Sequence, residues 1–175
     1  PTKILANKNI MLVGGGLGNA VLFSIGKAFR DAGSKVLYFA GYKKGHDRYK
    51  IKEIEAAADQ VIWACDENIT FKDVRDGDGF FIGNIVKAIK AYYDGDIAKK
   101  IMDINALDQI IAIGSDKMMA AIKNLRNDFL KNNPVEMIAS VNSPMQCMMK
   151  EICAQCLQKH IDQETGEEYF VYSCA

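Results

Sequence analysis

The chain has 175 residues, with 22 basic and 22 acidic side chains and no net charge. Neutral charge argues against a nucleic-acid partner, because binding phosphates needs clustered Lys and Arg, and no apolar run reaches the roughly 18 residues of a membrane span. With 49% hydrophobic and 25% charged residues, the chain has the composition of a globular protein that buries its core without disulfides. No signal peptide opens the sequence, so we expect a reducing, cytoplasmic setting.

The first third of the chain alternates between apolar runs and amphipathic segments. Each apolar run predicts a buried strand, and apolar residues at helical spacing predict a helix. Gly33 stands where it could cap the C-terminus of the first predicted helix. The expected elements are a strand over 8–16, a helix over 19–33, a strand over 34–42, a short helix over 47–58 and a strand over 59–67.

The alternation continues to about residue 143. Here we expect a helix over 79–95 that continues after a break over 96–104, a strand over 107–115, a long amphipathic helix over 116–133 and a strand over 135–143. Near-continuous apolar strands alternating with helices are typical of a parallel sheet covered on both faces. The sequence therefore predicts an α/β domain with five parallel strands in the order 3-2-1-4-5, followed near Pro144 by a small C-terminal lobe rich in Met and Cys.

Four glycines, Gly14, Gly15, Gly16 and Gly18, lie between the first predicted strand and the first helix. Without Cβ atoms the backbone can approach a pyrophosphate closely, and a helix N-terminus presents N–H groups and a positive dipole end. Ligands of open α/β sheets bind at the carboxyl ends of strands, so this turn is a candidate phosphate site. The spacing differs from G-x-G-x-x-G, because Val21 stands at the third glycine position, and a tight turn that binds nothing remains an alternative.

Other strand ends should meet the same edge. Asp66 follows the third strand and could accept hydrogen bonds from ribose hydroxyls, although a solvated loop carboxylate is the simpler interpretation. Ser115 and Asp116 follow the fourth strand, where either residue could cap the next helix. The basic loop after the second strand, with Lys43, Lys44 and Arg48, could meet a 2′-phosphate, and Cys65 is best explained as a core residue.

The cysteines near the C-terminus follow the pattern C-x5-C-x2-C-x17-C, formed by Cys147, Cys153, Cys156 and Cys174. This spacing approximates the plant-type [2Fe–2S] pattern, in which a loop supplies three thiolates and a distant cysteine the fourth. A hairpin turn near Gly166 would let the strand-like stretch 167–175 deliver Cys174. Tetrahedral zinc, a redox disulfide between Cys153 and Cys156, and inert packed thiols stay open on spacing alone.

The segments "VGGGLGNA", "AIGSDKMM" and "SVNSPMQC", with the cysteine tail, resemble the C-terminal half of ferredoxin–NADP reductase-type flavoproteins. The resemblance extends over essentially the whole chain and is strongest to the electron-transfer subunit of dihydroorotate dehydrogenase, with similar segments in glutamate synthase- and sulfide dehydrogenase-like oxidoreductases. It implies an NAD(P)-binding domain over 1–142 and a [2Fe–2S]-binding lobe over 143–175. The first cysteine gap is one residue longer than is usual in that family.

The resemblance also implies roles for particular residues. The four glycines of the first turn would bind the NAD(P)H pyrophosphate, Gly114, Met118 and Met119 would line the nicotinamide side, and Asp66 matches an acid that often follows the third strand. The four tail cysteines would bind the cluster. The β-barrel that binds FAD in this family is absent, so FAD would be held by that barrel in a longer protein or by a partner redox subunit. The start at Pro1 fits a piece of a longer protein or a processed chain.

Two classes of function follow from these observations. The first is an NAD(P)H-dependent oxidoreductase module that passes electrons between nicotinamide, flavin held elsewhere and a [2Fe–2S] cluster. No acid–base pair or triad is required of this chain, because the cofactors supply the chemistry. The second is a non-enzymatic nucleotide-binding or zinc-stabilised interaction domain.

Overall fold

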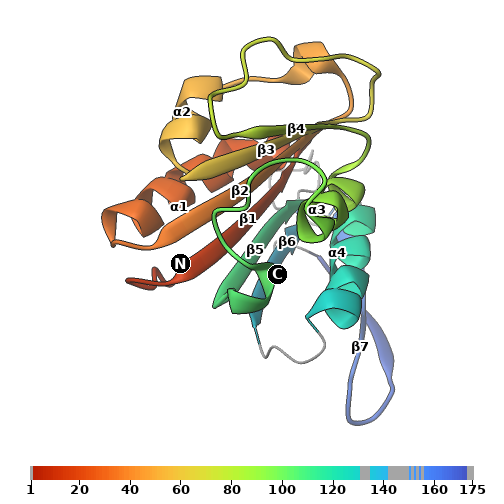
Figure 1. The fold of residues 1–175 in the computed structure, drawn as a ribbon. Helices are drawn as coiled ribbons and strands as arrows, with labels where there is room; N and C mark the ends of the chain where they lie inside the picture. Colours follow the sequence, from red (N-terminus) through yellow and green to blue (C-terminus); the bar gives the residue numbers. More distant parts are fainter. Residues whose placement is uncertain are drawn as a thin grey trace. The chain divides into compact units, whose positions relative to one another are not determined.

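A single parallel sheet forms the frame of the N-terminal part of the protein. The computed structural model describes residues 2–130, 135–141, 150, 152, 154 and 156–172. The chain divides into two compact units, Pro1–Val141 and Asn142–Ala175. The sheet of the first unit has six strands in the order β4-β3-β2-β1-β5-β6, all parallel (Figure 1). Its strands are β1 Asn9–Gly15, β2 Lys35–Tyr42, β3 Gln60–Cys65, β4 Gly79–Ile82, β5 Gln109–Gly114 and β6 Glu136–Val141.

Helices cover both faces of this sheet (Figure 1). They are α1 Asn19–Asp31, α2 Ile51–Ala56, α3 Ile85–Asp94 and α4 Asp116–Phe129, with short 3-10 turns η1 Gly16–Gly18, η2 Gly45–Asp47 and η3 Ile104–Ala106. Alternate residues of β1 face opposite cores, as the pleat of a strand requires. Ile10 and Leu12 pack with α1 and α2, whereas Met11 and Val13 pack with α3 and α4.

The predicted α/β class and the relative order of the five expected strands are confirmed, but the strand count was wrong. The segment expected to be one helix over 79–95 is the edge strand β4 followed by α3. Gly83 separates them at a φ of 137°, which a helix cannot contain, and the Asn84 side chain then caps α3 by accepting from the Lys87 N–H at 3.0 Å. β4 pairs with β3 from Gly79 to Ile82 and so completes the sheet.

The helix expected over 96–104 is also absent from the structure. α3 ends at Asp94, because the next residue, Gly95, has a φ of 90° and lies in the left-handed region, where an α-helix cannot continue. The next residues are instead held by hydrogen bonds to the end of α3, because Tyr92 Oη accepts from the Ile101 N–H at 3.0 Å and Lys100 Nζ donates to the Tyr93 carbonyl at 2.6 Å. Polar tethers of this kind replace the intrahelical bonds that the apolar spacing had predicted.

Aspartates anchor the amino-terminal ends of the strands, the end of the sheet called here its amino edge. Asp59, Asp78 and Asp108 each stand immediately before a strand and accept a hydrogen bond from the first residues of the neighbouring strand. The carboxylate-to-N distances are 2.7 Å for Asp59 and Val36, 2.8 Å for Asp78 and Val61, and 2.8 Å for Asp108 and Asn9. These bonds satisfy backbone donors at the point where each ladder begins.

The second unit contains a β-hairpin. β7 Leu157–Ile161 pairs antiparallel with β8 Glu168–Tyr172. The turn between them includes Gly166 at a φ of 74°, and the Gly166 N–H donates to the Asp162 carbonyl at 2.9 Å. The predicted hairpin turn near Gly166 is therefore confirmed. The structure does not show a cysteine-rich lobe, because Cys156 is the one cysteine of the predicted four within the described residues.

Candidate functional site

The carboxyl ends of the parallel strands form one edge of the sheet (Figure 1). β1 runs into η1 and then α1, so the four glycines form a strand–turn–helix connection, as predicted. β5 lies beside β1, with Gly14 opposite Ile113. The turn after β5 is therefore next to the glycine turn. Asp66 follows β3, two strands away across β2.

The four glycines of the first turn have different neighbours. A Cβ on Gly14 would lie 1.9 Å from Asn19 Oδ1, one on Gly15 would lie 2.6 Å from Met118 Sδ, and one on Gly18 would lie 2.1 Å from the Ile113 carbonyl oxygen. These three glycines let other protein groups pack closely. Gly16 differs, because it has a φ of 53° and a Cβ there would meet nothing within 4 Å. Of the four, Gly16 is the position where the missing side chain opens onto free space.

The two methionines of the β5–α4 turn have different surroundings. Met118 lies against both glycine turns, since a Cβ on Gly114 would come within 2.5 Å of Met118 Cε. Met119 is 8% exposed and packs in the core with α3 and α4. Ser115 caps α4 by accepting from the Met118 N–H at 3.3 Å. The structure thus brings Gly15, Gly114 and Met118 together and directs Met119 into the interior.

The end of β3 holds one exposed and one buried residue of interest. Asp66 is exposed, and its N–H donates to the Tyr42 carbonyl at 3.1 Å. Cys65 is fully buried, in agreement with the core assignment, and its Sγ lies 3.8 Å from the Lys43 carbonyl oxygen. Burial raises the pKa of the Cys65 thiol, and the nearby Glu67 and Asp66 carboxylates add to that shift. Cys65 is therefore a neutral thiol at physiological pH.

The loop after β2 contains an arginine that is withdrawn from solvent. The Arg48 side chain is 6% exposed and forms an ion pair with Asp73. Its guanidinium carbon lies 4.0 Å from the ring centroid of Phe71 and 5.0 Å from that of Trp63. The Arg48 side-chain hydrogen bond lowers the pKa of the Asp73 carboxyl group. Arg48 thus ties the 43–50 loop to the segment after β3, whereas Lys43 and Lys44 are exposed.

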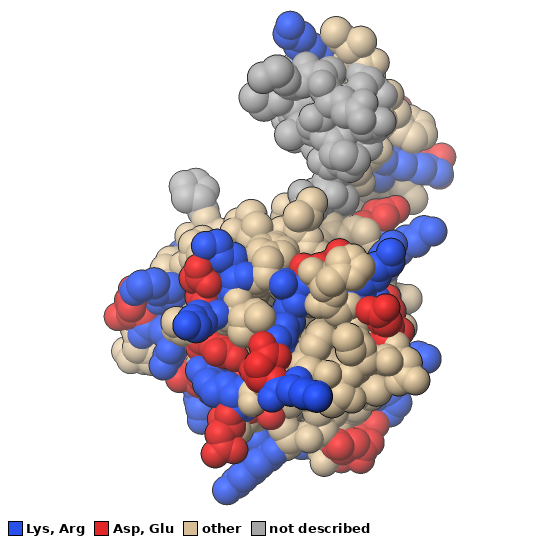
Figure 2. All heavy atoms as spheres, turned by 90° about the horizontal axis from the view of Figure 1, so that it is seen from above, with Lys and Arg blue, Asp and Glu red and all other residues tan. Residues whose placement is uncertain are grey.

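Charged side chains of both signs lie interspersed on the face seen in Figure 2. Among the described residues, several opposite charges form pairs one helical turn apart, such as Lys27 with Asp31 at 2.8 Å and Lys50 with Glu53 at 2.7 Å. No area of a single sign dominates this view. Across the described residues, no helix is both long and apolar enough to cross a bilayer.

Two residues that the sequence analysis did not select contact the glycine turn. Asn19 is fully buried and its Nδ2 donates to the Gly16 carbonyl at 3.0 Å. The Tyr49 hydroxyl lies 3.2 Å from the same carbonyl oxygen and 3.3 Å from that of Leu17. A signal for Asn19 was present, because it shares the buried stripe of α1 with Leu22, Gly26 and Phe29, and a polar residue in such a stripe needs hydrogen-bond partners.

Most of the predicted metal ligands fall outside the described residues, namely Cys147, Cys153 and Cys174. Cys156 is described, is 1% exposed and stands next to Leu157, the first residue of β7. Within the residues that the structure describes, no group of three or more His, Cys, Asp or Glu side chains is placed to hold a metal ion.

Comparison with known proteins identifies relatives of the fold. The structure of an NADH-dependent reduced ferredoxin-NADP oxidoreductase matches with a TM-score of 0.61 at 21% identity, covering 99% of this chain. The C-terminal domain of the PF1911 hydrogenase from Pyrococcus furiosus matches with a TM-score of 0.55 at 16% identity, covering 80% of this chain. The fold is shared with oxidoreductases. At these identities the likeness concerns the fold alone.

These matches extend over different shares of the other chains. This chain spans 52% of the ferredoxin-NADP oxidoreductase chain and 96% of the hydrogenase domain. The chain is also 34% identical over 72 residues to the uncharacterized protein RP006 of Rickettsia prowazekii (strain Madrid E). The matched region covers 41% of this chain and 9% of that protein. No protein-family profile matches the chain.

Proposed function

We propose that this chain is an NAD(P)H-linked electron-transfer module of a larger oxidoreductase that also contains FAD and a [2Fe–2S] cluster. In this proposal residues 1–142 bind the dinucleotide, residues 143–175 bind the cluster, and an FAD-binding barrel or partner subunit completes the assembly. When bound, the nicotinamide supplies hydride, the flavin separates the electron pair, and the cluster carries single electrons. The ferredoxin-NADP oxidoreductase that shares this fold was studied for flavin-based electron bifurcation, and this chain spans 52% of it. The rest of that chain is long enough to contain a further domain, which supports a partner domain for this one.

The observation that carries the nucleotide proposal is the open position at Gly16. Three of the four glycines are in close contact with protein atoms, whereas Gly16 presents bare backbone at a φ of 53° next to free space. This position stands at the carboxyl end of β1 and immediately before α1, where phosphate groups bind in open α/β folds. The N-cap residue of α1 is Gly18, which has no side chain to cap the helix, whereas Asn84 and Ser115 cap α3 and α4.

The other candidate residues have roles that follow from their positions. Met118 lies against both Gly15 and Gly114 and would form an apolar wall beside the dinucleotide. The exposed Asp66 carboxylate would accept hydrogen bonds from a ribose. Met119 would act indirectly by holding the start of α4 against the core, because it is 8% exposed. The chain's contribution is to position and orient the dinucleotide.

Replacing Gly16 by valine should weaken nucleotide binding without unfolding the domain. The new side chain would occupy the space through which a phosphate approaches, and we expect the Kd for NADH or NADPH to rise about tenfold or more, equivalent to about 1.4 kcal/mol. Isothermal titration calorimetry on the full chain measures this change. Gly77→Val is the matched control, because Gly77 also has a positive φ, 87°, with nothing within 4 Å of its missing Cβ. Equal affinities for the two variants would exclude the glycine turn as the site.

The cluster proposal rests on the hairpin and on the chemistry of thiolates. Leu157, which follows Cys156, pairs with Tyr172 at the open end of the β7–β8 hairpin. Tyr172 stands two residues before Cys174 in the sequence. Cysteine thiolates are the ligands of [2Fe–2S] clusters. Cys147, Cys153, Cys156 and Cys174 are the residues that would bind the iron atoms.

Reconstitution distinguishes the cysteines of the tail from the buried one. We expect protein treated anaerobically with iron and sulfide to become red-brown and to give a [2Fe–2S] electron paramagnetic resonance signal when reduced. Cys156→Ser and Cys174→Ser should abolish or shift the signal because each removes a ligand. Cys65→Ser should leave it unchanged because Cys65 is buried at the end of β3. Stoichiometric zinc in protein expressed with ample iron would instead favour the zinc-stabilised interaction domain.

A further inference from the structure

The second unit exposes a group of apolar side chains. Among the described residues, ten large hydrophobic side chains are exposed, and five of them belong to this unit, although most of the described residues belong to the first. Four of the five lie on the β7–β8 hairpin, namely Leu157, Ile161, Tyr169 and Phe170 (Figure 1). Single exposed apolar residues are common on protein surfaces, whereas a group of them on one short element indicates an interaction surface.

The register of the hairpin places three of these side chains on one face. Residues that pair directly in an antiparallel ladder point to the same side of the sheet. This face is formed by three such pairs, Leu157 with Tyr172, Lys159 with Phe170 and Ile161 with Glu168. On it, Leu157 is 39% exposed, Ile161 50% and Phe170 63%. These three residues are called here the apolar face of the hairpin.

The hairpin gains little stability from its own contacts on this face. Lys159 Nζ and Glu168 Oε1 form an ion pair at 2.6 Å, but the two side chains are 48% and 55% exposed. Exposed ion pairs contribute little because water screens them, and an isolated two-stranded hairpin is only marginally stable in water. A partner that covered the apolar face would stabilise the hairpin, because it would remove exposed apolar surface from water.

The turn at the end of the hairpin is acidic. Residues 162–168 contain four carboxylates and no Lys or Arg, namely Asp162, Glu164, Glu167 and Glu168. Asp162 Oδ1 accepts from the N–H groups of Thr165 and Glu164, both at 2.8 Å, and these hydrogen bonds lower the pKa of the Asp162 carboxyl group. Asp162 therefore stays ionised at neutral pH and holds the turn in shape. Lys159 pairs with Glu168, so the turn keeps a net negative charge.

We infer that the β7–β8 hairpin is a docking surface for a protein partner whose own apolar patch is bordered by lysine and arginine side chains. The apolar face of the hairpin would be buried at the centre of the contact, and the exposed Glu164 and Glu167 would meet the basic border. Interfaces combine an apolar centre with a polar rim, and complementary charges speed association and select the partner. The inference goes beyond the proposed function, because it follows from the hairpin surface and requires neither nucleotide nor cluster.

Binding of cytochrome c tests this inference. Cytochrome c is a small basic protein that presents an apolar patch ringed by lysines, and an acidic ferredoxin serves as the probe of opposite charge. In isothermal titration calorimetry with the full chain at low ionic strength, we expect cytochrome c to bind and the ferredoxin not to bind. The Kd for cytochrome c should rise with added salt, because salt screens exposed charges.

Two hairpin variants separate the apolar from the charged contribution. Phe170→Ser should raise the Kd for cytochrome c about fivefold, and the double variant Glu164→Lys with Glu167→Lys should raise it about tenfold or more at low salt. Val21→Ser and Asp96→Lys are the matched controls, because they change exposed apolar and acidic residues of the first unit. All of these positions are exposed, so circular dichroism should show unchanged melting temperatures, and the two controls should bind like the wild type.

The outcomes that would overturn the inference are distinct. They are no binding of cytochrome c at low salt, equal affinity of the wild type and the hairpin variants, and tighter binding of the ferredoxin. Dimerisation of the chain in analytical ultracentrifugation that Phe170→Ser abolishes would also overturn it, because a second copy would then cover the apolar face. The titrations use protein without added nucleotide, iron or sulfide, so their failure does not count against the proposed function, which has its own tests.

Discussion

Replacing Gly18 by alanine is expected to lower the free energy of unfolding by about 3 kcal/mol or more, the upper range for overpacked core substitutions. A Cβ at this position would lie 2.1 Å from the Ile113 carbonyl oxygen and 2.7 Å from its carbonyl carbon. These atoms belong to β5, which is paired on both sides by β1 and β6 and cannot move aside. Urea denaturation followed by circular dichroism measures the loss.

Gly16→Ala provides the comparison within the same turn. Its Cβ would meet nothing within 4 Å, and the substitution costs only the strain of a φ of 53°, about 1–2 kcal/mol. The two variants therefore separate backbone strain from steric overlap. Losses of equal size would show that the close approach of Gly18 to β5 does not limit stability.

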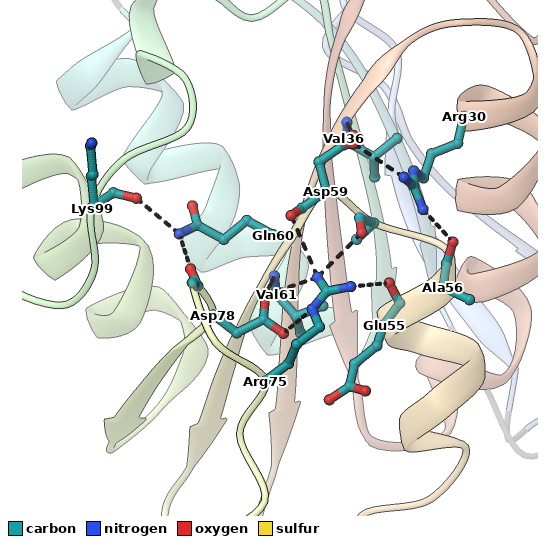
Figure 3. Close-up of polar contacts among 12 residues, drawn as sticks. Arg30, Val36, Glu55, Ala56, Asp59, Gln60, Val61, Arg75, Asp78 and Lys99 are labelled. Atoms are coloured by element: carbon teal, nitrogen blue, oxygen red, sulfur yellow. Dashed lines mark hydrogen bonds and ion pairs between the residues drawn. The ribbon is translucent and has the colours of Figure 1, made fainter.

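Replacing Asp78 by alanine is the second substitution with a large expected effect, a loss of about 2–3 kcal/mol in the free energy of unfolding. The Asp78 side chain is 1% exposed and accepts from the Val61 N–H at 2.8 Å and from Arg75 Nη2 at 2.9 Å (Figure 3). Arg75 also donates to the Glu55 carbonyl at 2.8 Å, so the pair joins β3, the segment before β4 and the end of α2. Removing the carboxylate leaves the Val61 N–H without its acceptor and the Arg75 guanidinium without its counter-ion, although Arg75 keeps its hydrogen bonds to backbone carbonyls.

Asp108→Ala is the matched control for Asp78→Ala. Asp108 makes the same kind of contact, accepting from the Asn9 N–H at 2.8 Å and from Lys8 Nζ at 3.0 Å, but its side chain is 33% exposed. Water can replace the lost acceptor there, so we expect a loss of about 1 kcal/mol. Thermal unfolding of both variants at neutral pH gives the comparison. A loss at Asp108 as large as that at Asp78 would contradict the role assigned to burial.

The strands of the sheet were readable because their apolar runs are long and bounded by glycine or polar residues. β4 was not, since its four residues join the apolar pattern of α3 and periodicity does not separate a short strand from a helix start. The Gly83-Asn84 pair was the available signal, because glycine breaks a helix and asparagine caps the next one. The order of the five expected strands was correct, and β4 adds to it at the edge next to β3.

The position of the glycine turn was predictable from sequence, but the different surroundings of its four glycines were not. Which glycine faces Asn19, Met118 or free space depends on how α1 and α4 pack on β1 and β5. The contact of Tyr49 with the turn joins residues 33 and 32 positions apart in the chain. Single-sequence patterns carry no information on such pairs. The burial of Arg48 was also not predictable, because this basic residue lies in a loop that was expected to be solvated and yet packs against Trp63 and Phe71.

The three aspartates that precede β3, β4 and β5 have a consequence for how this domain can change over evolution. Each of them secures strand pairing from the amino edge, using a contact made before the strand begins. The exposed residues Lys43, Lys44 and Asp66 follow the strands at the other edge and make no side-chain contribution to these three bonds. Mutations that alter ligand preference can therefore accumulate at one edge while the determinants of strand order persist at the other, so that divergence in specificity need not pass through unstable intermediates.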